Sequence, residues 1–218
     1  MKKIFTTVAV VCSLFVSIST FAQGTKKAGQ DAATNKGDVI LDVGVGFGGG
    51  YYSENSYNGN FYNGNGYSKT QGGIPTLSVS LQKAFWEDIT IGGEIAFNAY
   101  NEEYSWNNNG NKSSYQKYNQ TNTFILAKGE YHFNRLIGLD PKFDLYAGVI
   151  AGLRISGSTR QYTDYNNGNN DYITKNNYTN FEVGAFGGFR YYFIKNMAVY
   201  AEVGWAINPF RTGLAWKF

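Results

Sequence analysis

The chain has very little of what most enzymes and helical domains are built from. Its 218 residues include one cysteine, one histidine, two methionines and three prolines, and charged residues make up only 16%. One cysteine excludes a disulfide scaffold and a thiolate metal site, and one histidine excludes a histidine cluster. An ordinary soluble domain carries roughly 25% charged residues. The shortage of charge therefore argues against an α-helical bundle.

Glycine and aromatic residues are abundant instead. The sequence contains 27 Gly, 18 Tyr, 16 Phe and 4 Trp, and aromatic residues reach 17%. Aromatic and β-branched residues suit strands, and glycine disfavours helices. So many aromatic side chains also argue against disorder. The composition and length together predict one β-rich domain.

Residues 1–22 have the features of a secretory signal peptide. Lys2 and Lys3 form a basic start, an apolar stretch follows, and Thr20-Phe21-Ala22 supplies small residues at the −3 and −1 positions of a cleavage site. The apolar stretch is too short for a spanning helix. We expect cleavage after Ala22.

The chain beyond the signal peptide divides into two parts. Residues 23–37 are small and polar without periodicity, which predicts a flexible leader. Residues 38–218 form the predicted barrel domain. Loss of two lysines with the signal peptide takes the formal charge from +3 to +1, with 17 basic and 16 acidic residues. This near balance gives no reason to expect a nucleic-acid partner.

From Asp38 onward apolar residues recur at every second position. Successive side chains of a strand face opposite sides of a sheet, so this period predicts strands. Val39, Leu41 and Val43 share one face of the first strand, and Leu214, Trp216 and Phe218 share one face of the last. About eight such strands follow one another, and most have the roughly 9–11 residues that a tilted membrane strand needs. The pattern predicts an all-β, eight-stranded antiparallel transmembrane up-and-down β-barrel.

The predicted connections alternate between short and long. Tight turns are expected at Glu87-Asp88, residues 135–141 and Lys195-Asn196, with a short final connection near Asn208-Pro209. Barrels of outer membranes have short periplasmic turns and long extracellular loops. Three long loops rich in Asn, Gly, Tyr and Ser are predicted at Ser53–Gly72, Ser105–Asn119 and Arg160–Tyr178.

The polar face of the strands decides which side meets lipid. The interior of an eight-stranded barrel is just wide enough for side chains to fill. Large aromatic residues would crowd it, whereas glycines and paired charges fit, so we expect the apolar face to contact lipid. In the alternative, a soluble barrel resembling a lipocalin, the charges would face water. The predicted interior ionisable residues are Asp42, Glu94, Lys128, Glu130, His132, Asp144, Arg154, Glu182, Arg190, Glu202 and Lys217.

With its signal peptide, alternating strands and terminal phenylalanine, the chain resembles the small bacterial outer-membrane β-barrel proteins of the OmpA/OmpX type. The resemblance covers residues 38–218. It implies a monomer in the outer membrane of a Gram-negative bacterium, in contact with membrane lipid and lipopolysaccharide. It also implies that the barrel-assembly machinery reads the C-terminal residues Leu214, Trp216 and Phe218. First and last strands must pair, because an open edge is costly in hydrocarbon.

The sequence nominates no catalytic, cofactor-binding or metal-ligating residue. His132 beside Glu130 is interpreted as a hydrogen-bonded interior residue rather than an acid–base group. The Tyr- and Asn-rich loops suit binding, which predicts a non-enzymatic structural or surface-interaction role and leaves an extracellular ligand open. Two alternatives remain open: a narrow porin-like channel and a lipid-modifying barrel enzyme.

Overall fold

The structure is a computed structural model that describes residues 33–47, 67–108, 111–165, 170–205 and 207–218. The predicted signal peptide lies outside the described residues. So do most of the predicted leader and most of the predicted loop Ser53–Gly72.

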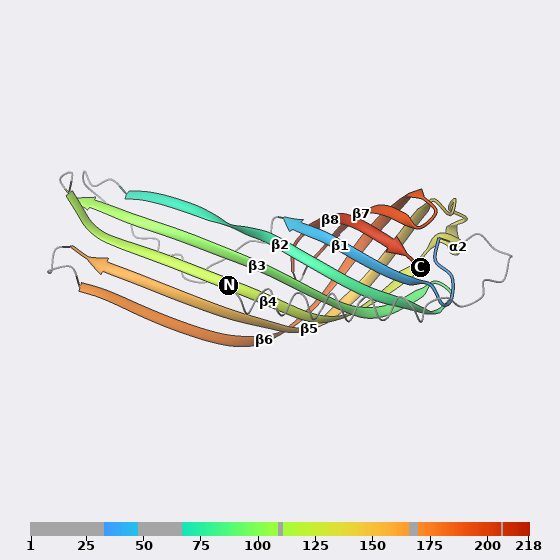
Figure 1. The fold of residues 1–218 in the computed structure, drawn as a ribbon, viewed down its shortest axis with the longest axis horizontal. Helices are drawn as coiled ribbons and strands as arrows, with labels where there is room; N and C mark the ends of the chain where they lie inside the picture. The colour runs from blue at the N-terminus through green and yellow to red at the C-terminus, as the bar shows by residue number, and fades with distance from the viewer. Residues whose placement is uncertain (1–32, 48–66, 109–110, 166–169, 206) are drawn as a thin grey trace.

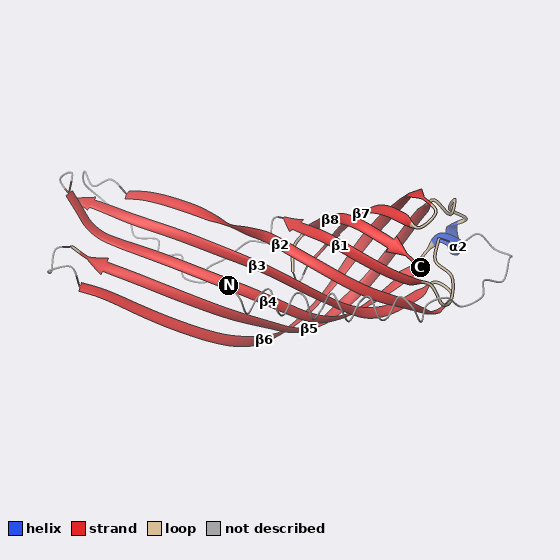
Figure 2. Cartoon of the chain, viewed as in Figure 1, coloured by secondary structure: helices blue, strands red, loops and turns tan. Residues whose placement is uncertain are grey.

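Eight antiparallel strands close into a barrel in simple sequence order (Figures 1 and 2). The first and last strands pair along their length, with Gly44 opposite Gly213. The predicted eight-stranded antiparallel up-and-down barrel is therefore confirmed. The strands are β1 (Val39–Phe47), β2 (Tyr67–Trp86), β3 (Ile89–Asn108), β4 (Asn111–His132), β5 (Phe143–Asp164), β6 (Asn170–Ile194), β7 (Met197–Gly204) and β8 (Phe210–Lys217).

Short connections join the strands at one end, which we call the turn end. Glu87-Asp88 joins β2 to β3, and Asp88 takes the positive φ of 69° that Asp tolerates better than most residues. Lys195-Asn196 joins β6 to β7, as predicted. The four-residue helix α2 (Asn134–Ile137) stands between β4 and β5. Within the described ranges, no helix has the length and apolar character to cross a bilayer.

The strands differ greatly in length. β1, β7 and β8 have eight or nine residues, whereas β2 to β6 have 20 to 25. The five long strands therefore continue past the closed ring as one open sheet, seen at the left of Figure 1. We call this sheet the extension; it comprises residues 67–75, 100–108, 111–122, 156–164 and 170–180.

The extension contains strands where two long loops were predicted. Most of Ser105–Asn119 and of Arg160–Tyr178 is paired strand, with Glu103 opposite Lys117 and Arg160 opposite Thr174. The prediction was wrong because it used an apolar period of two. Both faces of these segments are polar, so the period disappears although backbone pairing continues.

Aliphatic side chains cover the outside of the closed ring, and aromatic side chains flank them at both rims. From Phe181 to Phe193 the chain of β6 advances roughly 40 Å along the strand, or about 30 Å along the axis of a barrel with tilted strands. The exposed aliphatic residues include Val43, Leu77, Ile91, Ile95, Ile125, Leu145, Val149, Leu153, Val183, Val199, Val203 and Leu214. The exposed aromatic residues at the rims include Phe85, Trp86, Tyr131, Phe193 and Phe218 at the turn end, and Phe47, Phe181, Trp205 and Phe210 at the other rim. Phe189 and Tyr191 of β6 are exposed between the two rims.

The interior holds more aromatic residues than expected. Tyr146, Phe186 and Tyr200 are buried there, against the prediction that large rings would crowd it. Glycines make the room, because a Cβ built at Gly188 would lie 2.4 Å from the Tyr146 ring. Similarly, a Cβ at Gly204 would lie 2.6 Å from Phe186 Cβ. The interior glycines thus leave the space that the interior aromatic rings occupy.

The last part of the predicted flexible leader is packed into the turn end. Ala33 and Thr34 are buried, and Lys217 Nζ donates to the Ala33 carbonyl at 2.5 Å. Thr34 Oγ1 lies 3.3 Å from Nδ1 of His132. Burial and these contacts thus place Ala33 and Thr34 against the turn end of the barrel.

Candidate functional site

A network of buried charges fills the middle of the barrel. Nη2 of Arg190 donates to Asp42 at 2.9 Å, and Nη1 donates to Glu130 at 3.0 Å and to Asp144 at 3.3 Å. The guanidinium also lies 4.0 Å from the centre of the Tyr146 ring. Several carboxylates around one guanidinium offset much of the cost of burying it.

A second group of charges adjoins the first on the side toward the extension. Lys128 Nζ lies 2.9 Å from Glu202 and 3.1 Å from Glu130. Arg211 pairs with Glu94 and, at 2.6 Å, with Glu202. Arg211 was missing from the predicted interior set. It alternates with Phe210 and Thr212 on β8, so the same two-residue alternation of side chains would have placed it in the interior.

An apolar layer separates these charges from the extension. Lys128 Nζ lies 4.8 Å from the centre of the Phe186 ring, which covers it. The layer therefore seals the charged network from that side. Its buried members are Ala96, Phe124, Leu126, Ile150 and Phe186.

Most predicted interior residues lie where expected. Arg154 and Glu182 are half-buried and pair with each other at 2.9 Å, and Lys217 lies at the turn end, 4.6 Å from the Tyr192 ring centre. The buried members are Asp42, Glu94, Lys128, Glu130, His132, Asp144, Arg190 and Glu202.

The hydrogen bonds around His132 follow the order of a catalytic triad, but the group lacks the open position that a catalytic triad needs. Nδ1 lies 2.8 Å from Asp144, and Nε2 lies 3.2 Å from the Thr90 hydroxyl. All three side chains are at most 1% exposed, and Asp144 is shared with Arg190. A nucleophile needs an open position for its substrate, and the packing leaves Thr90 none. The group satisfies buried polar atoms, as predicted for His132.

The extension offers an accessible surface of a different kind. Its inner face, the one continuous with the barrel interior, carries cross-strand rows of polar and aromatic side chains from β4, β5 and β6. Hydrogen bonds link neighbouring rows, since Gln120 Nε2 donates to Asn122 at 2.9 Å and to the Tyr178 hydroxyl at 3.2 Å. The three rows are Asn122–Ser156–Tyr178, Gln120–Ser158–Asn176 and Tyr118–Arg160–Thr174.

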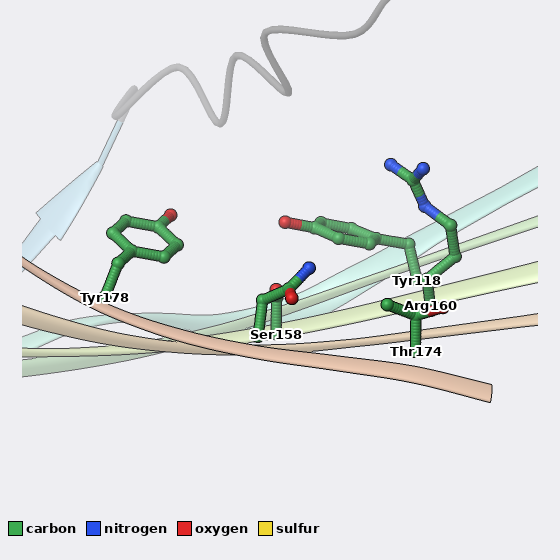
Figure 3. A pocket seen from close by; sticks show the side chains of 6 residues that line it. Tyr118, Ser158, Arg160, Thr174 and Tyr178 are labelled. Atoms are coloured by element: carbon green, nitrogen blue, oxygen red, sulfur yellow. The ribbon is translucent and has the colours of Figure 1, made fainter.

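A pocket of about 440 Å³ lies on this inner face (Figure 3). The rings of Tyr118 and Tyr178 stand on either side of Ser158, and the Arg160 guanidinium lies above Tyr118, 5.8 Å from its ring centre. This volume is within the usual range for small-molecule sites. Tyr118, Ser158, Arg160, Thr174, Asn176 and Tyr178 line the pocket.

Arg160 is the one charged residue among the six that line the pocket. Partial burial raises the pKa of the Tyr118 phenol above its ordinary value, which already lies well above neutral pH. On the outer face of the extension, Lys117 Nζ lies 2.6 Å from Glu103. The hydrogen bond to Lys117 lowers the pKa of Glu103, and the same bond raises the pKa of Lys117.

Sequence reasoning located this surface only as two loops. It singled out Arg160–Tyr178 but could not bring Tyr118 opposite Arg160, because that neighbour relation depends on the strand register. Across the described parts of the chain, no group of three or more His, Cys, Asp or Glu residues is arranged to hold a metal ion.

Comparison with known proteins yields similarity in solved structures alone. No protein family and no curated protein matches the chain. The outer membrane protein OprG from Pseudomonas aeruginosa is 12% identical, with a TM-score of 0.45, covering 87% of this chain and 99% of OprG. The N-terminal β-barrel domain of P. aeruginosa OprF is 14% identical, with a TM-score of 0.42, over 85% and 100% of the two chains. Ail, the attachment invasion locus protein of Yersinia pestis, is 7% identical, with a TM-score of 0.41, over 85% and 100%.

Proposed function

We propose that this chain is a non-enzymatic outer-membrane barrel that holds the extension outside the cell as an interaction surface. The observation that carries the proposal is the contrast between a lipid-compatible exterior and a sealed, charged interior in one closed ring. The aliphatic band and its aromatic rims have the height and order that membrane barrels use. The polar extension, too hydrophilic for lipid, then stands in water.

This placement assigns partners to each surface of the barrel. Membrane lipid contacts the aliphatic band, and lipopolysaccharide contacts the rim near Phe181 and Trp205, which are 70% and 68% exposed. Leu214 faces outward in the middle of β8 and Phe218 faces outward at the turn end, and the barrel-assembly machinery would read them together with Trp216. Ring closure within one chain favours a monomer.

Two cysteine variants test location and orientation together. Lys175→Cys lies on the extension and Lys195→Cys on a turn at the other end, and both lysines are exposed. The natural sequence has one cysteine, Cys12, inside the predicted signal peptide, so the label reports the new thiol. A membrane-impermeant maleimide should label Lys175→Cys on intact cells, and Lys195→Cys only after the outer membrane is permeabilised. Equal labelling of both, or the reverse order, would overturn the proposal.

A conducting pore is the weaker candidate. Arg190 is 0% exposed and Glu202 is 2% exposed, and the apolar layer lies above them. Ions would need a continuous wet path, which paired charges and packed rings deny. Planar bilayers containing the purified protein should stay silent. Steady conductance altered by charge reversal at Glu94 or Arg154 would favour the channel instead.

A lipid-modifying activity requires an accessible nucleophile. Thr90 is sealed beside His132, and its hydroxyl also donates to Gln82 at 3.0 Å. Lipid A and phospholipid profiles should therefore be identical in cells expressing the natural chain and His132→Ala. A profile that changes with this substitution would favour the enzyme.

A further inference from the structure

The pocket between Tyr118 and Tyr178 is built from rigid neighbours rather than from a loop. Tyr118, Arg160 and Thr174 are consecutive cross-strand partners on β4, β5 and β6. Ser158 and Asn176 are direct partners in the next row. Rows on one face are two residues apart, about 7 Å, and strands lie about 4.8 Å apart. The surface is therefore a fixed grid of ring faces and hydrogen-bonding groups.

We propose that this grid binds an oligosaccharide, with pyranose rings lying against Tyr118 and Tyr178 and their hydroxyls bonded to the floor of the pocket. The inference rests on the proposed function, because the pocket must stand outside the cell to meet such a chain.

The lining chemistry matches the two surfaces of a sugar ring. A pyranose has an apolar face of C–H bonds and an edge of hydroxyls that both donate and accept. Tyrosine offers a flat apolar ring with a polar tip. Ser158, Thr174 and Asn176 are neutral groups that both donate and accept, as hydroxyls require. Arg160 adds donors for a hydroxyl or a carboxylate oxygen.

The same lining argues against other ligand classes. No aliphatic side chain lines the pocket, so it lacks the apolar anchor on which protein partners and lipid chains depend. Arg160 is the one charged residue among the six, and nearby Arg154 is paired with Glu182. Polyanions such as nucleic acid bind through many cationic contacts. A neutral or weakly acidic polyhydroxylated ligand fits the pocket better.

Hydrogen bonds hold the two tyrosines before any ligand arrives. The Tyr118 hydroxyl donates to Gln120 Oε1 at 2.6 Å, and Gln120 Nε2 donates to the Tyr178 hydroxyl at 3.2 Å. Gln120 is anchored in turn to Asn122, which accepts from Ser156 at 2.6 Å. Side chains that are already ordered lose less entropy on binding.

The test is titration of the purified barrel in detergent micelles with defined hexasaccharides. Maltohexaose, cellohexaose and chitohexaose are the neutral probes, and a hyaluronan hexasaccharide is the acidic one. Polysaccharide released from the lipopolysaccharide of the producing cells tests whether the ligand belongs to the same cell. Isothermal titration or tyrosine fluorescence should give saturable binding to at least one probe. Saturation by the cell's own polysaccharide alone places the source in the same envelope, and saturation by the other probes places it outside.

Variants assign the binding to the pocket. Tyr118→Ala should raise Kd at least tenfold, and Tyr118→Phe, which keeps the ring, should raise it less. Tyr115→Ala is the matched control, three residues earlier on β4 and on the outer face, and should leave Kd unchanged. Arg160→Ala should weaken acidic probes more than neutral ones, whereas Lys175→Ala should affect neither.

The outcomes separate this inference from the proposed function. Each variant is first checked for the heat-dependent gel mobility of a folded barrel. If Lys175→Cys is labelled on intact cells but no probe binds, the carbohydrate inference is overturned and the surface placement stands. Equal loss in Tyr118→Ala and Tyr115→Ala would also overturn it. If the labelling fails, the placement itself is wrong.

Discussion

The closed ring and the extension are made from the same strands, yet they use opposite chemistry. Inside the ring, full charges such as Arg190 and Glu130 are buried and paired. On the extension, neutral amides and hydroxyls such as Gln120 and Ser158 face solvent in part. Backbone pairing is continuous between them along β3 to β6. Side chains, rather than the backbone, therefore distinguish the two regions.

The boundary between the two regions is a short chain of amides. Asn122 Nδ2 donates to Asn98 at 2.8 Å, and Asn98 Nδ2 donates to Thr76 at 3.0 Å. All three residues are buried, directly above Phe124 of the apolar layer. Buried polar groups that satisfy one another in this way fix the register of the strands that carry them. The boundary therefore links β2, β3 and β4 by side-chain hydrogen bonds as well as by backbone pairing.

We expect the largest difference in stability between the two regions when a buried charge is removed. Arg190→Leu would leave Asp42, Glu130 and Asp144 without their shared guanidinium, at a cost of about 3–5 kcal/mol. Arg160→Leu, the same change on the extension, should stay within about 0.5 kcal/mol. Urea unfolding in detergent, followed by heat-dependent gel mobility, measures both. Similar costs at both sites would remove the distinction, and an Arg190→Leu protein that never shows folded mobility would support it.

Replacing a glycine with alanine should give the next largest difference in stability between the two regions. Gly188→Ala places a Cβ 2.4 Å from the Tyr146 ring inside the barrel, which should cost about 1–3 kcal/mol. The Cβ of Gly157→Ala would meet the Asn177 side-chain oxygen at 3.2 Å, which can move aside, and Thr121 Oγ1 at 3.5 Å, an ordinary contact distance. The unfolding midpoint of this variant should therefore stay close to that of the natural chain. A larger loss at Gly157 than at Gly188 would contradict the packing described here.

Removing the end of the extension should cost still less. Residues 103–117 can be replaced by an Asn-Gly turn, since Glu102 and Tyr118 are opposite each other. The ring keeps its complete interior, so the urea midpoint and the heat-dependent mobility should not change. A shortened chain that loses folded mobility would mean that the extension helps the ring to form.

The smallest effect is a local response to pH at the same hairpin. The pKa of Glu103 is lowered in the folded state by its bond to Lys117, so the pair stabilises the hairpin at neutral pH. This stabilisation is lost as the pH falls below the ordinary pKa of glutamate, about 4. Amide exchange, corrected for its intrinsic rates, should rise at the hairpin in acid. Glu103→Gln should abolish the response, and an unchanged response would assign it to another group.

The sequence predicts the features of this fold that depend on residues close together in one strand, and it fails for features that depend on several strands. The inward position of Arg190 and Glu202 follows from alternation within one strand, and the structure buries both. Pairing of β1 with β8 follows from the cost of an open edge. The pocket does not follow, because it needs Tyr118 beside Arg160 and Thr174, three residues from strands whose register is set elsewhere. Polar strands hide that register, since a shift of one residue would expose no apolar side chain.

The even number of strands returns the chain to the end from which it started. Val39 N donates to the Phe218 carbonyl at 3.1 Å, and Phe218 N donates to the Val39 carbonyl at 2.9 Å. In the proposed orientation, which puts the turns in the periplasm, a reporter fused at either terminus of the barrel would stay on the periplasmic side of the membrane. Cargo meant for display would have to be spliced into a hairpin tip, between β3 and β4 or between β5 and β6. The barrel would then act as a ready scaffold that lifts such an insert clear of the bilayer.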